Sequence, residues 1–180
     1  GRGPAGPRLD DRGVVGPVPS KPVVLWVCSA LFRRTANDAP IAGKWIQALR
    51  TSDDPAVRDA GILVRPHPAR LDEWQNVDLT GYKNVVLWGA HPIDPEAKDD
   101  YFESLYYSAA VVGTNTSAFL EAGIAGRPVY AIRLHDVSPN NPGGPSQFHY
   151  LLHVTDGLVV TPRRLGEHAS QILSAVVAPA

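Results

Sequence analysis

Residues 108–132 (SAAVVGTNTSAFLEAGIAGRPVYAI) have the pattern of a strand, a polar turn, a helix and a second strand. The apolar run at residues 109–112 ends at Gly113, and hydroxyl and amide side chains follow at the point where a helix would begin. Apolar residues then repeat at helical spacing, Gly126 is typical of a helix end, and residues 129–132 form a second apolar run. This stretch predicts a β–α–β unit, around which the rest of the chain is organised.

The polar turn of this unit consists of Thr114, Asn115, Thr116 and Ser117. A helix that opens directly behind a strand presents unpaired backbone N–H groups at the carboxyl edge of a sheet, which favours an anion such as phosphate. Glu121 follows one turn later, where its carboxylate can accept hydrogen bonds from a ribose. The same residue types also serve simply as helix caps, and a first-turn glutamate suits the helix dipole, so both interpretations stay open.

The rest of the chain alternates short apolar runs with amphipathic segments. The strand-like runs are residues 23–28 (VVLWVC), 61–64, 84–88 and 158–160, and the helix-like segments are residues 40–49, 99–108 and 162–176. The helix-like segment at residues 99–108 carries a largely aromatic stripe that we expect to face the core: Tyr101, Phe102, Leu105 and Tyr106. The alternation predicts an α/β fold: a doubly wound, Rossmann-like, mostly parallel sheet with helices on both faces.

A second polar segment, residues 65–68 (RPHP), follows the strand at residues 61–64. The two prolines fix the backbone and force the chain out of the sheet, so Arg65 and His67 lie on a stiff turn. The guanidinium of Arg matches phosphate, and His can donate a hydrogen bond or a proton near neutral pH. Asn37 and Asp38 belong to a polar loop after the first strand, which faces either a ligand or solvent.

Composition limits the class of protein. The chain has 180 residues, of which 44% are hydrophobic and 19% charged, and its net charge is −1. We expect one globular domain over residues 22–180, no nucleic-acid partner and no transmembrane segment. Residues 1–21 form a Pro/Gly-rich lead or linker, expected to be disordered. Cys28 is the single cysteine, which excludes an internal disulfide and makes a reducing, cytoplasmic setting the default.

The segment GTNTSAFLEAGIAGRPVYAI and the RPHP turn resemble the C-terminal, donor-binding half of GT-B fold glycosyltransferases of the surface-polysaccharide and polyol-phosphate transferase type. The resemblance implies that Thr116 and Ser117 hold the diphosphate of a nucleotide-sugar and that Glu121 binds the ribose. Thr114 and Asn115 of the same turn are further candidate substrate contacts. The resemblance also implies that His67 is a candidate for catalysis or phosphate contact. Arg65 and His149 are further candidate substrate contacts.

The resemblance predicts a nucleotide-sugar-binding domain of a glycosyltransferase that acts in polysaccharide or glycan synthesis, without cofactor or metal. Such enzymes bind a glycan or polyol-phosphate acceptor on a second domain, which we do not find in this sequence. Two alternatives remain open: a sugar-nucleotide epimerase, and a non-catalytic module that binds a nucleotide or a protein. Titration with nucleoside diphosphates separates them in part, because a purely structural module should bind none.

The lead generates a first prediction. Its residues 1–20 contain few large apolar side chains, so their deletion should leave the melting midpoint of the chain nearly unchanged. Calorimetric melting of the full and shortened chains checks this. A drop of several degrees, equivalent to about 1 kcal/mol or more, would mean that the lead packs on the domain.

Overall fold

The computed structural model describes residues 7–9, 15–17, 21–29, 37–89, 94–132, 159–162 and 164–177. Its main element is a six-stranded sheet with the strand order β5-β4-β3-β6-β7-β8, in which all neighbouring strands are parallel. The strands are β3 (Val23–Val27), β4 (Gly61–Arg65), β5 (Val85–Leu87), β6 (Ala110–Gly113), β7 (Val129–Ala131) and β8 (Val159–Val160).

The strand order identifies the type of sheet. Counted from β3, the order reads 3-2-1-4-5-6, which is that of doubly wound nucleotide-binding domains. The direction of winding reverses between β3 and β6, and ligands of such sheets bind outside the carboxyl ends of the strands at this switch point. The predicted α/β, Rossmann-like fold is therefore confirmed.

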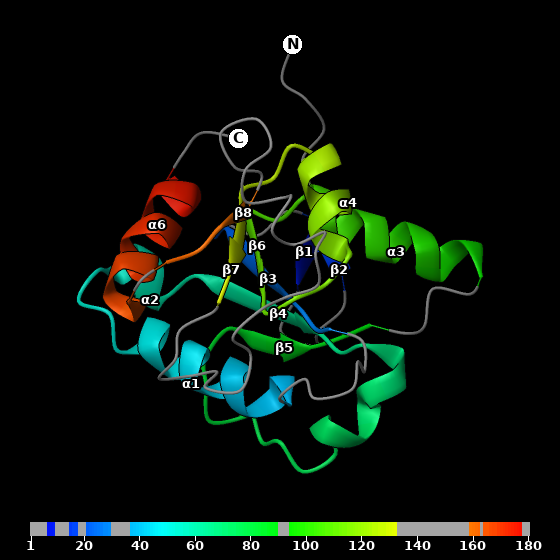
Figure 1. The fold of residues 1–180 in the computed structure, drawn as a ribbon, viewed down its shortest axis with the longest axis horizontal. Coiled ribbons are helices and arrows are strands. Elements are labelled where there is room, and N and C mark those ends of the chain that lie inside the picture. The colour runs from blue at the N-terminus through cyan, green and yellow to red at the C-terminus, as the bar shows by residue number, and fades with distance from the viewer. Residues whose placement is uncertain are drawn as a thin grey trace.

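Helices cover both faces of the sheet (Figure 1). On one side lie α1 (Asp38–Arg50), α2 (Pro55–Arg58), the 3-10 segment η1 (Pro68–Trp74) and α6 (Leu165–Val177). On the other side lie α3 (Pro95–Tyr106) and α4 (Ala118–Ile124). For the helices that connect strands, this division follows from right-handed crossovers, because the chain winds first toward β5 and then, from α3 onward, toward β8. α6 comes after β8 and packs back against α1 on the first side.

The central strand β3 explains why its sequence is apolar without alternation. Val24 and Trp26 point into the core under α1, whereas Leu25 and Val27 point into the core under α4. Both faces of the strand are thus buried, as expected for a parallel sheet between two helical layers. Trp26 packs on Trp45 of α1 with a ring-centroid distance of 5.0 Å.

The predicted end of α4 at Gly126 is confirmed by its hydrogen bonds. Gly126 has φ of +73°, its N–H donates to the carbonyl of Gly123, and the N–H of Arg127 donates to that of Ala122. This is the Schellman arrangement, which requires a left-handed residue that glycine adopts without strain. At the other end of the unit, a Cβ on Gly113 would lie 2.6 Å from the Val27 carbonyl oxygen, so only glycine permits β6 to approach β3 this closely.

The helix predicted at residues 99–108 begins earlier, at Pro95. The reason is a cap: the carboxylate of Asp94 accepts the N–H of Ala97 at 2.8 Å, and proline at the first helical position needs no N–H partner. The expectation that the whole aromatic stripe of this helix faces inward is wrong. Leu105 is buried, but Phe102 and Tyr106 are 56% and 43% exposed and stack on each other outside the core.

Two short strands, β1 (Pro7–Leu9) and β2 (Val15–Pro17), lie within the lead. They form an antiparallel pair with each other and do not join the six-stranded sheet. The prediction that the lead contributes little to stability is compatible with this separate pairing and stays a prediction.

His168 of α6 is an unusual component of the core. Its side chain is fully buried between Trp45 and Tyr130, with ring-centroid distances of 6.2 and 5.4 Å. Among the described residues, neither of its ring nitrogens has a hydrogen-bond partner. Burial penalises the imidazolium, so the pKa of His168 is lowered from 6.5 to about 4.

This shift predicts acid sensitivity. The unfolded chain takes up a proton at this histidine below pH 6.5, but the folded chain does so only below about pH 4, so stability falls as the pH falls through that window. Between pH 7 and pH 5 the loss from His168 should be about 2 kcal/mol. Urea unfolding of the parent chain and of His168→Phe measures it as the difference between the two pH profiles. Parallel profiles would contradict the prediction.

Candidate functional site

The topology brings most of the residues predicted as a site to one edge of the sheet. Arg65 is the last residue of β4 and not, as the sequence predicted, part of the turn behind it, and His67 follows the strand. The polar turn 114–117 follows β6, and Glu121 lies on α4 directly behind that turn. β3 lies between β4 and β6, so the two polar segments are two strand spacings apart, about 10 Å. His149 lies outside the described residues.

A buried carboxylate occupies the switch point between β3 and β6. Asp38, the first residue of α1, is 1% exposed. One of its oxygens accepts the backbone N–H of Ser29 at 2.6 Å and the hydroxyl of Ser29 at 2.8 Å, and the other accepts the hydroxyl of Thr114 at 2.7 Å. Asp38 thereby joins the end of β3, the end of β6 and the start of α1.

The charge of Asp38 is balanced by an equally buried cation. Arg70 of η1 is 1% exposed, and its guanidinium lies 3.7 Å from the Asp38 carboxylate. It also donates to the hydroxyl of Ser29 at 3.2 Å and forms an ion pair with Glu73. Glu73 in turn accepts the backbone N–H of Asp38 at 3.0 Å. The ion pairs and hydrogen bonds offset the desolvation cost of burying three charged groups together.

This network changes what the switch point can bind. In doubly wound nucleotide folds the first amides behind the first strand hold a phosphate. Here the amide of Ser29, the second residue of this connection, donates to the protein's own carboxylate. The one hydroxyl proton of Thr114 is also donated to Asp38. Among the residues that the structure describes, an internal anion thus takes the Ser29 amide and the Thr114 hydroxyl, two donors that a ligand phosphate between β3 and β6 could otherwise use.

The outer part of the turn is more accessible. Asn115 and Thr116 are half-buried, whereas Ser117 and Glu121 are exposed. The Thr116 hydroxyl oxygen accepts the N–H of Ala118 at 3.3 Å, so Thr116 caps α4 locally. Ser117 makes no side-chain cap bond. The polar groups of the turn that are accessible from solvent therefore lie outward of Thr114, on the side of Glu121.

Arg65 is held in place from several sides. Its side chain is 5% exposed, and one guanidinium nitrogen donates to the carboxylate of Asp100 at 2.8 Å. The ring of Tyr101 lies 5.4 Å from the guanidinium carbon. A Cβ on Gly89 would lie 3.0 Å from the guanidinium, so the backbone of Gly89 packs directly against it. The structure shows Arg65 as a buried cation under the edge of the site, paired with Asp100.

His67 precedes η1, whose start it caps, and is half-buried. Its Nδ1 accepts the N–H of Ala69 at 3.1 Å. A nitrogen that accepts carries no proton, so the neutral ring bears its proton on Nε2. The structure therefore gives His67 a fixed ring orientation with a hydrogen-bond donor at Nε2, at the end of β4.

The described residues support neither a cysteine nucleophile nor a metal site. Cys28 is buried, and burial together with the nearby Asp38 carboxylate raises the pKa of its thiol, so it stays protonated and unreactive. No group of three or more His, Cys, Asp or Glu side chains in the described part of the chain is arranged to hold a metal ion. None of the described helices is long and apolar enough to cross a bilayer.

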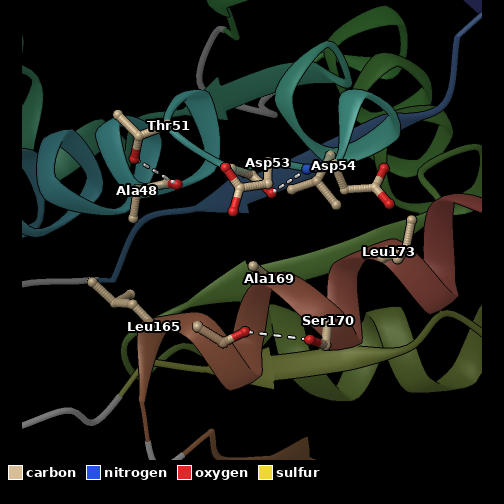
Figure 2. A pocket seen from close by; sticks show the side chains of 11 residues that line it. Ala48, Thr51, Asp53, Asp54, Leu165, Ala169, Ser170 and Leu173 are labelled. Atoms are coloured by element: carbon tan, nitrogen blue, oxygen red, sulfur yellow. Dashed lines mark hydrogen bonds between the residues drawn. The ribbon is translucent and has the colours of Figure 1, made fainter.

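A surface pocket of about 420 Å³ lies between the C-terminal end of α1, α2 and α6 (Figure 2). It is at the opposite end of α1 from Asp38, about 20 Å away along the helix. Three of its polar side chains are engaged locally: the hydroxyl of Thr51 donates to the Ala48 carbonyl, the Asp54 carboxylate caps α2, and the hydroxyl of Ser170 donates to the Gly166 carbonyl. This pocket is separate from the carboxyl edge.

The comparisons with known proteins concern the fold. No family model matches the chain, and no curated protein matches its sequence. Among solved structures, the wall teichoic acid polymerase TagF is similar over 86% of this chain and 34% of that chain, with 17% identity and a TM-score of 0.51. A variant of TagF gives 18% identity and a TM-score of 0.52 over the same shares. The calicheamicin glycosyltransferase CalG4 gives 22% identity over 87% of this chain and 34% of that chain, with a TM-score of 0.42.

The chain thus spans about a third of the length of the TagF structures that it matches. At this level of identity the likeness establishes a shared fold. It confirms that this chain has the fold of a part of TagF, in agreement with the fold that the sequence predicted.

Sequence reasoning missed most of the residues that hold the site together. Asp38 was placed in a loop facing ligand or solvent, although an acidic residue two positions before Pro40 is a helix-start signal. Arg70 and Tyr101 carried no such signal. An isolated arginine in a polar segment looks solvated, and a tyrosine in an aromatic stripe looks like core.

The buried network predicts a large stability effect at Asp38. Replacing it with alanine leaves buried donors on Ser29 and Thr114 without an acceptor and Arg70 with less compensating charge. We expect Asp38→Ala to lower the free energy of unfolding by about 3 kcal/mol or more. The exposed Asp72 of η1 is a matched control, and Asp72→Ala should change it by less than about 0.5 kcal/mol. Urea unfolding measures both, and equal losses would refute the role of the network.

Proposed function

We propose that this domain binds the nucleoside diphosphate of a nucleotide-sugar and forms the donor half of a glycosyltransferase. The observation that carries the proposal is an exposed carboxylate, Glu121, one turn behind a polar turn at the carboxyl edge next to the switch point. The fold shared with the polymerase TagF supports it, because that protein acts in the synthesis of wall teichoic acid.

The diphosphate is proposed to lie against the outer part of the turn. Asn115, Thr116 and Ser117 supply amide and hydroxyl groups there, while Thr114 is committed to Asp38 and contributes by fixing the start of the turn. Arg65, buried and paired with Asp100, adds positive charge beneath the edge. The carboxylate of Glu121 accepts hydrogen bonds from the ribose hydroxyls. His149 stays a proposed substrate contact.

The proposed reaction is transfer of the sugar from the diphosphate to a hydroxyl of a glycan or a polyol-phosphate acceptor. The acceptor oxygen bonds to the anomeric carbon, the hydroxyl proton leaves to a base, and the bond to the diphosphate oxygen breaks. Stabilising charge on the departing diphosphate is the main task of such a site. His67 has its donor at Nε2 and is proposed to donate a hydrogen bond or a proton to that leaving group.

The acceptor and the remaining catalytic groups are proposed to come from a second domain facing this edge. Sugar-nucleotide chemistry in a reducing compartment fits a cytoplasmic location, which is part of the proposal. No sugar-specific group is assigned to the described residues.

Calorimetric titration of the 180-residue chain with ADP, CDP, GDP and UDP tests the proposal. We expect at least one to bind with a dissociation constant between about micromolar and millimolar, since one open face leaves the ligand largely solvated. Glu121→Ala should weaken that binding by roughly 1.5 to 3 kcal/mol, the value of a hydrogen bond to a charged group.

The control is Glu103→Ala, which removes another exposed glutamate, on α3, and should leave binding unchanged. The 2′,3′-dideoxy analogue should bind the parent chain as weakly as the ribonucleotide binds Glu121→Ala. Equal affinity of the parent chain for the two nucleotides would remove the ribose role of Glu121.

A further inference from the structure

The hydroxyl of Tyr101 donates a hydrogen bond to the carboxylate of Glu121. Tyr101 belongs to α3 and Glu121 to α4, two helices on the same face of the sheet (Figure 1). The bond therefore connects the exposed carboxylate to a helix 20 residues earlier in the chain. An exposed glutamate is otherwise free to sample several rotamers, so this contact restricts a side chain that solvent alone would leave mobile.

The tyrosine that makes this contact is itself fixed. Its ring lies on the guanidinium of Arg65, 5.4 Å from the ring centroid, and Arg65 is only 5% exposed. Asp100 holds the guanidinium from the side and also accepts the indole N–H of Trp88 at 3.2 Å. A buried cation under an aromatic ring is an attractive contact in its own right. The position of the Tyr101 hydroxyl is therefore fixed by contacts with residues at the ends of β4 and β5.

The chemistry of the contact leaves the carboxylate able to bind more. A carboxylate offers about four lone-pair sites, and the Tyr101 hydroxyl takes one of them on Oε2. A ribose diol needs two acceptor sites, which Glu121 retains. Burial and the neighbouring Glu121 raise the pKa of Tyr101, so its hydroxyl stays protonated and keeps donating throughout the physiological pH range.

We propose that Tyr101 is a positioning residue that holds the Glu121 carboxylate in the orientation that binds the ribose, and so sets the preference for ribonucleotides over deoxynucleotides. The proposal rests on the proposed function of Glu121. Fixing the carboxylate before the ligand arrives removes part of the entropy cost of binding, which is the general benefit of a preorganised site.

The competing interpretation is that the bond merely ties α3 to α4. The two interpretations differ in one measurement: a tie between helices affects stability, whereas a positioning residue affects discrimination between nucleotides that differ only in their ribose hydroxyls. Tyr101→Phe is the informative variant, because it removes the hydroxyl and keeps the ring over Arg65. Tyr106→Phe is a matched control, since Tyr106 is an exposed tyrosine on the same helix whose ring stacks on Phe102.

The experiment titrates the 180-residue chain and its variants with the best-binding of ADP, CDP, GDP and UDP and with the 2′,3′-dideoxy form of the same nucleotide. Tyr101→Phe should weaken the ribonucleotide by roughly three- to tenfold and leave the dideoxynucleotide unchanged, so that discrimination falls. Tyr106→Phe should behave as the parent chain. In the Glu121→Ala background, Tyr101→Phe should have no further effect, because the two act as one unit.

The outcomes separate the two proposals. If Glu121→Ala loses discrimination and Tyr101→Phe keeps it, the positioning role of Tyr101 is overturned and the ribose role of Glu121 stands. If the parent chain binds both nucleotides equally or binds none of the four, both proposals fail. A lower melting midpoint of Tyr101→Phe with unchanged discrimination would assign the bond to helix packing alone.

Discussion

The carboxylate of Asp38 is the point at which the separate parts of this domain are joined. It accepts hydrogen bonds from Ser29 behind β3 and from Thr114 behind β6, and it lies beside the buried guanidinium of Arg70 from η1. Parallel strands end with unpaired amides at one edge, and an anion placed there satisfies them. In many nucleotide folds that anion is the ligand's phosphate. In this domain the anion is the side chain of Asp38, so the ends of β3 and β6 are connected in the absence of any ligand.

An internal anion at the switch point divides the carboxyl edge into two parts. Between β3 and β6 lies a network in which Ser29, Asp38, Arg70 and Thr114 are 1 to 3% exposed, whereas the part on the α4 side carries exposed polar groups, Ser117 and Glu121. The site we propose therefore lies outward of Thr114, where the polar turn meets α4.

A second charged network supports that outer part. Arg65 has the residue type and location expected of a phosphate ligand, yet the structure places Asp100 at its side and the ring of Tyr101 above it. A guanidinium that is nearly fully buried costs free energy unless it is paired, and the pairing fixes its neighbours in turn. Through Tyr101 this rigidity extends to Glu121, the most exposed member of the chain of contacts. The buried guanidinium of Arg65 thus fixes the position of the side chains that reach solvent at this edge.

The sequence by itself determined the fold class, because periodicity, glycine positions and helix-end signals are local properties. The continuous apolar run of β3, the Gly126 stop of α4 and the strand–turn–helix order all follow from residues close together in the chain. Pairings between distant residues were decided only by the tertiary structure. Asp38 meets Thr114, 76 positions away, and Tyr101 meets Glu121, and no local pattern specifies either contact. Whether an isolated polar residue is solvated or buried with a partner depends on which strands become neighbours, and the sequence alone does not state that.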